Sequence, residues 1–280
     1  ATAGLPCRCG TPSPPGPPGG KRQRWLLTHN PEPRVRLHVV RCLPLRDLIV
    51  RALVTGADGF VGTHLVAWLL AEGDDVVEDA TDITDRDALI AAFTEVTPDV
   101  VYHLAAQADV GTSWSTPVET LRVNVEGTLN ALDAARLAGA TRVAVVTSAD
   151  IYGPVTEAEL PLTEQQPLRP VSPYAASKAA ADMLCVQAGL GHGFDVIRIR
   201  AFNHLGPGQS DKFVASALAR RVACAERNRE ATVRVGNLEA RRDFTDVRDV
   251  VRAYRALMVD GCPGQAYNVC SGIDLSLIHI

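Results

Sequence analysis

The stretch LVTGADGFVGT, residues 53–63, decides the fold, because it joins a short apolar run to a glycine-rich turn and then to an apolar helical pattern. The first glycine of such a turn permits the bend, the second lets the backbone approach a pyrophosphate, and the third lets the helix pack close to the strand. The helix N-terminus adds unpaired N–H groups and a partial positive charge. This pattern predicts that a nucleotide cofactor contacts Gly56, Gly59, Phe60, Val61 and Gly62.

The composition is typical of a soluble globular protein, with 46% hydrophobic residues and a net charge of −4. No apolar run approaches the roughly 20 residues that cross a bilayer, and the first residues lack the apolar core of a signal peptide. The seven cysteines show no paired metal-ligand spacing. We therefore expect a reduced, cytoplasmic protein with no membrane partner and no metal site.

Residues 1–49 differ from the rest of the chain. They hold nine of the eighteen prolines, and one lysine and seven arginines against two acidic residues. Such Pro/Gly density cannot form a buried core, so we predict a disordered or non-native extension. A nucleic-acid role would depend on this segment alone, and it lacks aromatic or helical support. At the other end, LSLIHI at 275–280 is typical of translated adapter DNA, which predicts a truncated C-terminal lobe.

Residues 50–201 predict an α/β fold: a Rossmann-like, doubly wound parallel sheet that binds NAD(P), with helices on both faces. The predicted strands are 51–55, 75–78, 98–106, 142–148 and 194–200, and the predicted helices are 65–72, 86–93 and two that begin at Thr116 and Pro173. Residues 202–280 predict a smaller, incomplete sugar-nucleotide-binding lobe. Its expected parts are a loop at 202–209, a helix at 212–226, strands at 232–235 and 265–269, and a helix at 247–258 that packs back on the first domain.

The second predicted strand ends in acid, about 20 residues beyond the glycine turn. An acid there accepts hydrogen bonds from the ribose hydroxyls and repels a 2′-phosphate, which favours NAD over NADP. The alternative is a solvated acidic turn. After the third strand, small residues let a cofactor lie close to the backbone, and we interpret His103 as a core histidine. The predicted cofactor contacts in these segments are Glu78, Asp79, Asp82, Ile83, Leu104, Ala105 and Ala106.

Tyr174 and Lys178 are four residues apart at the start of a predicted helix, so they share one face of it. An ammonium near a phenol stabilises the phenolate and lowers the tyrosine pKa, which suits a general acid or base. The alternative is a surface tyrosine beside a surface lysine. Ser148 stands at the carboxyl end of the fourth strand, where ligands bind in open α/β sheets. The combination with the glycine turn favours a catalytic site.

Over residues 50–272 the chain resembles the extended short-chain dehydrogenase/reductases that act on nucleotide sugars. The strings HLAAQADVGTSW, RAFNHLGPGQ, VGNLEARRDFTDVRDVVRAY and YNVCSG carry the resemblance, and they are most similar to members that reduce GDP-4-keto-6-deoxymannose. The resemblance implies that the catalytic residues are Ser148, Tyr174, Lys178 and Asn124. It also implies that Asn203, Lys212 and Arg242 bind the sugar-nucleotide substrate.

The chemistry that the resemblance implies is hydride transfer from NAD(P)H to the C4 carbonyl, which gives GDP-rhamnose. Tyr174 would protonate the developing alkoxide, Ser148 would hydrogen-bond that oxygen, and Lys178 would hold the cofactor ribose and lower the tyrosine pKa. Tyr174 and Lys178 are thus also expected cofactor contacts. The family also suggests a homodimer through the helices that begin at Thr116 and Pro173. The linker from Glu78 to Asp82 is shorter than in relatives, so the choice between NAD and NADP stays open.

Three other functions compete with this interpretation. GDP-mannose 4,6-dehydratases resemble the chain in the same motifs, but they carry a glutamate two residues before the Tyr-Gly pair, where this chain has Asp150. A 4-epimerase is a further alternative within the family. A non-catalytic NAD(P)-sensing protein belongs to a different class, and it would be expected to lose the serine, tyrosine or lysine, all of which are present.

Overall fold

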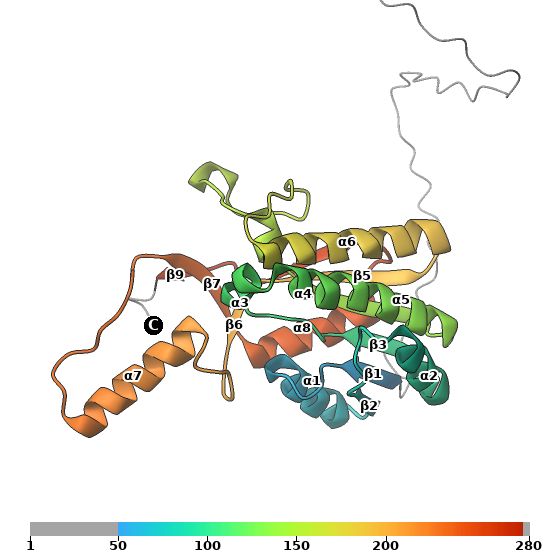
Figure 1. The fold of residues 1–280 in the computed structure, drawn as a ribbon, viewed down its shortest axis with the longest axis horizontal. Coiled ribbons are helices and arrows are strands. Elements are labelled where there is room, and N and C mark those ends of the chain that lie inside the picture. The colour runs from blue at the N-terminus through green and yellow to red at the C-terminus, as the bar shows by residue number, and fades with distance from the viewer. Residues whose placement is uncertain (1–49, 277–280) are drawn as a thin grey trace, which may run out of the picture. The chain divides into compact units, whose positions relative to one another are not determined.

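The computed structural model describes residues 50–276; residues 1–49, including the predicted extension, and residues 277–280 lie outside the described range. A six-stranded parallel sheet forms the centre, in the order β2-β1-β3-β4-β5-β8 (Figure 1). Its strands are β1 (Arg51–Thr55), β2 (Asp75–Asp79), β3 (Val100–His103), β4 (Arg142–Ser148), β5 (Asp195–Ala201) and β8 (Ala266–Val269).

Helices cover both faces of the sheet, as the continuous apolar character of the strands requires. In β1, Ala52 and Val54 pack in one core with α1 and α8, whereas Leu53 packs in the other with α2, α5 and α6. This confirms the predicted Rossmann-like α/β fold. The helices are α1 (Phe60–Ala71), α2 (Arg86–Val96), α3 (Val110–Ser115), α4 (Pro117–Leu121), α5 (Gly127–Leu137), α6 (Pro173–His192), α7 (Val214–Asn228) and α8 (Val247–Asp260).

The strand order reverses between β1 and β3, which are neighbours in the sheet although β2 separates them in sequence. Ligands of open α/β sheets bind at such a switch point, beyond the carboxyl ends of the strands. Thr55, His103 and Ser148 are the last residues of β1, β3 and β4, so they lie along this edge. Among residues 50–276, no helix has the length and apolar character that a membrane span needs.

A second sheet, β6-β7-β9, joins β6 (Asn203–Leu205), β7 (Arg241–Asp246) and β9 (Asp274–Ser276). β6 and β7 run parallel, and Asn203 pairs with Phe244. The prediction of a loop at 202–209 was wrong for β6, and the predicted strand at 232–235 does not form. A short β-branched run needs a partner strand to be stable, and residues 232–235 pair with no strand of the described chain. Residues 241–246 form β7, a strand that was not predicted.

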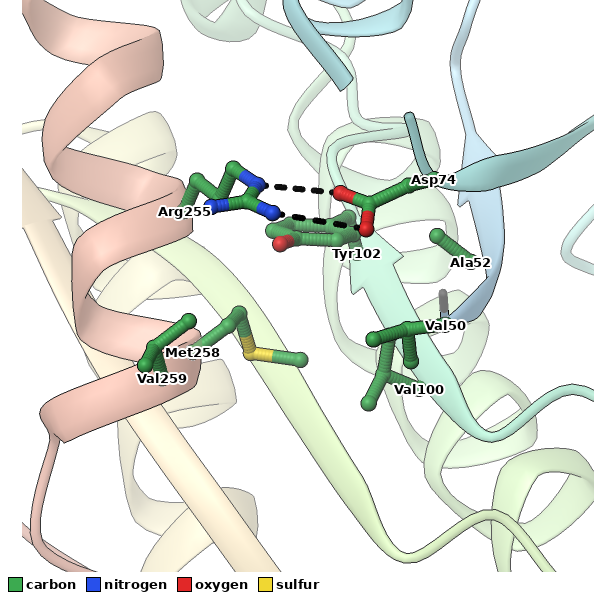
Figure 2. Close-up of a pocket in the computed structure, with 8 residues that line it drawn as sticks. All are labelled: Val50, Ala52, Asp74, Val100, Tyr102, Arg255, Met258 and Val259. Atoms are coloured by element: carbon green, nitrogen blue, oxygen red, sulfur yellow. Dashed lines mark hydrogen bonds and ion pairs between the residues drawn. The ribbon is translucent and has the colours of Figure 1, made fainter. Parts of the chain in front are cut away.

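The helix α8 packs against α1 and the sheet, burying Val250, Val251, Tyr254 and Met258. Arg255 of α8 extends to Asp74, which follows α1, with a 3.0 Å hydrogen bond from Nε to Oδ2. This ion pair borders a small cavity of about one water molecule (Figure 2). The cavity lies near Val50 and Val100, at the amino ends of β1 and β3. The cavity therefore lies at the amino ends of the strands, away from the carboxyl edge where ligands of such sheets bind.

Candidate active site

The glycine turn follows β1 and is held against the loop that follows β3. Gly56 has φ +69°, and a Cβ there would lie 2.8 Å from the Ala105 backbone nitrogen. A Cβ on Gly62 would lie 2.1 Å from the Gly56 carbonyl oxygen, so α1 could not pack this closely with a larger residue. Gly59 is the N-cap of α1 and gives the helix no side-chain cap. The first N–H groups of α1, at Phe60 and Val61, therefore remain available to an anion.

A buried chain of hydrogen bonds connects this turn to the helices behind it. Ala105 N–H donates to Thr55 Oγ1 (3.3 Å), and Thr55 Oγ1 lies 2.8 Å from His103 Nδ1. His103 Nε2 lies 3.2 Å from Thr128 Oγ1, which itself donates to the Asn124 carbonyl (2.7 Å). Because Thr128 uses its proton on Asn124, we assign the His103 proton to Nε2. Burial lowers the pKa of His103 to about 3, so the expectation of a neutral core histidine is confirmed.

Glu78 and Asp79, the acidic residues predicted to bind the cofactor ribose, lie at the end of β2 but differ in exposure. Glu78 is exposed, whereas Asp79 is half-buried beside Thr55 in the sheet register. Asp79 Oδ1 accepts from Thr81 Oγ1 (2.8 Å), and Asp79 Oδ2 is buried without a hydrogen-bond partner in the described part of the chain. A buried carboxylate oxygen without a donor is costly, so a ligand hydroxyl would satisfy it.

Asp82 and Ile83 lie in the turn before α2. Asp82 is exposed, and its carboxylate accepts hydrogen bonds from Thr84, which lower the pKa of Asp82. Ile83 is buried against Gly127, where a Cβ would lie 2.5 Å from Ile83 Cδ1, and its carbonyl accepts from Asn130. The structure therefore gives Ile83 a packing role and leaves Asp82 at the surface.

Ser148, Tyr174 and Lys178 come together at the carboxyl edge. Ser148 ends β4, and α6 buries Tyr174 and Lys178 on one face, as the four-residue spacing predicts. The Ser148 side chain lies close enough to the Tyr174 hydroxyl to lower its pKa. Lys178 Nζ donates to the Val146 carbonyl of β4 (2.9 Å). β4 thus places Ser148 near the Tyr174 hydroxyl and holds the Lys178 ammonium through the Val146 carbonyl.

The expected lowering of the Tyr174 pKa by Lys178 was wrong. Burial raises the pKa of Tyr174 to about 12; the nearby Ser148 side chain opposes this rise, and the charge of Asp150 adds to it. Burial also lowers the pKa of Lys178 to about 8. Loss of hydration is the largest cause of both pKa shifts, because each side chain lies almost wholly inside the protein. The phenol is therefore held protonated at neutral pH.

The Asn124 side chain hydrogen-bonds to Gln107 and Ser177 rather than to the Tyr174 phenol. It lies in a π-helical turn, Arg122–Glu126, between α4 and α5. Its Oδ1 accepts from Gln107 N (2.8 Å), and its Nδ2 donates to Gln107 O (3.0 Å) and to Ser177 Oγ (2.9 Å). The sequence analysis did not identify Ser177, although its place on the Tyr174 and Lys178 face of α6 was a usable signal.

The predicted substrate residues lie on the second sheet and the adjoining loop. Asn203 of β6 and Arg242 of β7 are exposed, and the positive charge of Arg242 acts on Asp150, close to Ser148 in sequence. Lys212, which precedes α7, is exposed and acts on Asp109, which caps α3. The second sheet and its loop therefore present two cationic side chains toward acids of the first domain.

An aromatic contact fixes the second sheet to the start of α1. Phe60 stacks on His204 of β6, with ring centroids 6.0 Å apart and planes inclined by 17°. His64 of α1 lies 2.9 Å, through Nε2, from the Pro207 carbonyl. The side chain of Phe60 therefore packs against the second sheet, and only its backbone is available for the predicted cofactor contact.

Comparison with known proteins gives consistent relatives. Residues 52–270 match the model of the "NAD dependent epimerase/dehydratase family". The chain is 42% identical over 228 residues to GDP-6-deoxy-D-mannose reductase of Pseudomonas aeruginosa, covering 79% of this chain and 75% of that one. It is 30% identical over 259 residues to GDP-mannose 4,6-dehydratase of Vibrio cholerae, covering 81% and 69%.

Among solved structures, RMD from Pseudomonas aeruginosa complexed with NADPH superimposes with a TM-score of 0.77. That structure is 40% identical in sequence to this chain, and the match covers 82% of this chain and 80% of that one. A match of this extent takes in most of the parallel sheet and the helices that cover it.

We predict that Lys178→Met stabilises the protein at neutral pH. The unfolded lysine keeps its proton up to about pH 10.5 and the folded one only to about pH 8, so charged Lys178 costs stability below pH 8. We expect the variant to gain about 1–2 kcal/mol in unfolding free energy at pH 7, and the gain to shrink as the pH rises from 8 toward 10. Urea unfolding at several pH values measures this.

The matched control is Lys212→Met, which removes an exposed lysine. It should change the unfolding free energy by less than about 0.5 kcal/mol at every pH. A Lys178→Met protein that is less stable than the parent at pH 7 would contradict the assignment of a destabilising buried charge.

Proposed function

Because the chain belongs to the NAD dependent epimerase/dehydratase family, we propose that it reduces the C4 carbonyl of GDP-4-keto-6-deoxymannose with NAD(P)H to give GDP-rhamnose. The 42% identity to GDP-6-deoxy-D-mannose reductase supports this substrate. The observation that carries the proposal is the buried group of Ser148, Tyr174 and Lys178 at the carboxyl edge of the sheet, where Lys178 is held by the Val146 carbonyl of β4.

The residues around the glycine turn fit a dinucleotide. The uncapped start of α1 suits a diphosphate, and the unpartnered Asp79 Oδ2 suits a ribose hydroxyl. Gly56 brings the turn against Leu104 and Ala105, so the loop that continues to Ala106 would border the same cofactor. When bound, NAD(P)H supplies the hydride.

The protonation state of Tyr174 suits reduction. Hydride addition to a carbonyl produces an alkoxide, which needs a proton from a nearby acid. A phenol with a pKa near 12 is protonated at pH 7 and still more acidic than an alcohol, so it can donate to the alkoxide. Ser148 would hydrogen-bond the same oxygen, and Lys178, held by Val146, would restore the proton or bind the ribose.

Two groups of the site, the Tyr174 phenol and the Asp150 carboxyl, favour reduction over dehydration. A 4,6-dehydratase begins by oxidising C4, so its tyrosine must accept a proton, and it also needs a group that removes the C5 proton. Here the phenol is held protonated, and Asp150 is one methylene shorter than the glutamate of the dehydratases. Arg242 is exposed and close enough to Asp150 to act on its charge, so its guanidinium would be available to a substrate diphosphate beside the site.

We predict that Tyr174→Phe lowers kcat about 10²- to 10⁴-fold, because it removes the general acid. Cofactor affinity should change less than about threefold, since the diphosphate and ribose contacts lie elsewhere. NAD(P)H consumption with GDP-4-keto-6-deoxymannose measures kcat, and fluorescence titration measures cofactor binding. Tyr102→Phe is the matched control, because Tyr102 is buried in β3 near the opposite cavity.

The same assay separates the alternative functions. Consumption of NAD(P)H with the keto sugar alone supports the reductase, and conversion of GDP-mannose with oxidised cofactor supports a dehydratase. Interconversion of a sugar nucleotide without net cofactor change indicates an epimerase. Cofactor binding without any turnover would leave the non-catalytic sensor as the better description.

We predict that Asp79 sets the preference for NADH over NADPH. Its unpartnered oxygen would accept a hydrogen bond from a ribose hydroxyl, and its negative charge would repel a 2′-phosphate. Asp79→Ser should raise the ratio of kcat/KM for NADPH to that for NADH by about tenfold, which is about 1.4 kcal/mol. Glu78→Ser is the matched control because Glu78 is exposed, and its ratio should stay within about twofold. Equal ratios in both variants would disprove the assignment.

We also propose a homodimer, supported by apolar side chains exposed on neighbouring helices. Val118 and Leu121 of α4, Leu129 of α5 and Met183 of α6 are each at least 40% exposed. α4 and α5 contact α6, so the three helices form one layer of the molecule (Figure 1). The free cysteines of the described chain, Cys185 among them, support the proposal of a reducing cytoplasmic setting.

The dimer is tested by Leu121→Glu combined with Met183→Glu, which places charges on this face. Light scattering should give the mass of a dimer for the parent protein and of a monomer for the double variant. Leu70→Glu is the control, because Leu70 is 55% exposed on α1, which covers the other face of the sheet. A parent protein that is monomeric at micromolar concentration would exclude the dimer.

A further inference from the structure

We propose that Ser177 is a positioning residue for the reaction proposed above: with Asn124, it holds the first turn of α6, and so the Tyr174 phenol, against the loop that follows β3. Ser177 lies between Tyr174 and Lys178 in sequence and has no exposed surface. It does not belong to the tyrosine–lysine pair, and the sequence motifs gave it no role. The expected effect on turnover rests on the proposed function, whereas the effect on hydrogen exchange does not.

The contacts of Ser177 connect two segments of the site. Its Oγ donates to the Tyr174 carbonyl (2.7 Å), one turn earlier in α6. The same Oγ accepts from Asn124 Nδ2 (2.9 Å). Asn124 in turn pairs with both backbone groups of Gln107. The hydroxyl therefore connects the backbone of the catalytic tyrosine to the loop that would border the cofactor.

This connection continues to the glycine turn by a second route. The Asn124 carbonyl accepts from Thr128, which contacts His103, and His103 contacts Thr55 directly before Gly56. All of these side chains are buried. The π-helical turn at Asn124 widens the helix locally, and such turns are frequent at functional sites. Tyr174 and the cofactor turn are thus fixed to one buried hydrogen-bonded framework.

Removal of the Ser177 hydroxyl leaves the framework incomplete. Asn124 Nδ2 keeps Gln107 O and loses its second acceptor, and the Tyr174 carbonyl loses its side-chain donor. A buried amide proton without a partner is unfavourable, so the asparagine or the first turn of α6 must shift. A shift of about 1 Å in a reacting group costs roughly 10²-fold in rate. Substrate and cofactor contacts made elsewhere would be unchanged.

The experiment compares Ser177→Ala with Ser113→Ala. Ser113 is equally buried, lies in α3 and donates to a carbonyl three residues earlier (Val110 O, 2.7 Å), so it matches Ser177 except for the asparagine partner. With NADH and GDP-4-keto-6-deoxymannose, Ser177→Ala should lower kcat about 10- to 100-fold while both KM values stay within about threefold. A kcat within about twofold of that of Ser113→Ala overturns the proposal.

A second measurement needs no substrate. Hydrogen–deuterium exchange of the full chain should be faster in Ser177→Ala than in Ser113→Ala for peptides that cover residues 104–108 and 172–179. Equal exchange in these peptides overturns the positioning role, whatever the turnover. If the parent protein does not reduce the keto sugar but the exchange difference is found, the proposed function fails and the positioning role of Ser177 stands.

Discussion

The close contact between the Gly56 turn and the Ala105 backbone is the constraint on which the rest of the site depends. A Cβ at Gly56 would lie 2.8 Å from Ala105 N, so the two segments touch where β1 and β3 end. This contact brings the helix start that suits a diphosphate beside the loop that Asn124 holds. Thr55 and His103 then fix the spacing with buried hydrogen bonds rather than with apolar packing, which makes it specific in direction as well as in distance.

Burial determines the acid–base character of the site more than the neighbouring charges do. It raises the pKa of Tyr174 and lowers that of Lys178, so it shifts both groups toward their neutral forms. At neutral pH the phenol is neutral, whereas the buried ammonium of Lys178 lowers the stability of the fold, as groups at functional sites commonly do. The large apolar cores on both faces of the sheet supply the stability that offsets this cost.

The central fold was predictable from the sequence because few other folds combine this glycine spacing with continuous apolar strands. β1 and β4 were predicted with the bounds that the structure has, and Tyr174 and Lys178 share the buried face that their spacing indicates. The errors came from tertiary context. Burial reversed the expected tyrosine pKa, the π-helical turn directed Asn124 toward Gln107, and residues 232–235 had no strand of the described chain to pair with. Ser177 was missed because its place on the Tyr174 and Lys178 face of α6 does not reveal its partner, Asn124, which is distant in sequence.

The pairing of β6 with β7 has a consequence for how such proteins can diversify. Residues 206–240, with α7, leave the body after Leu205 and return at Arg241, and Leu205 and Asp246 are paired neighbours. The two strands that flank this excursion are therefore held in one sheet whatever lies between them, and because they run parallel the excursion leaves from the carboxyl end of β6 and returns at the amino end of β7. Doubling its length would cost only about 0.6 kcal/mol in chain entropy. Evolution or engineering can therefore rebuild this arm to admit a different sugar or base while the hydride-transfer machinery at the sheet stays untouched.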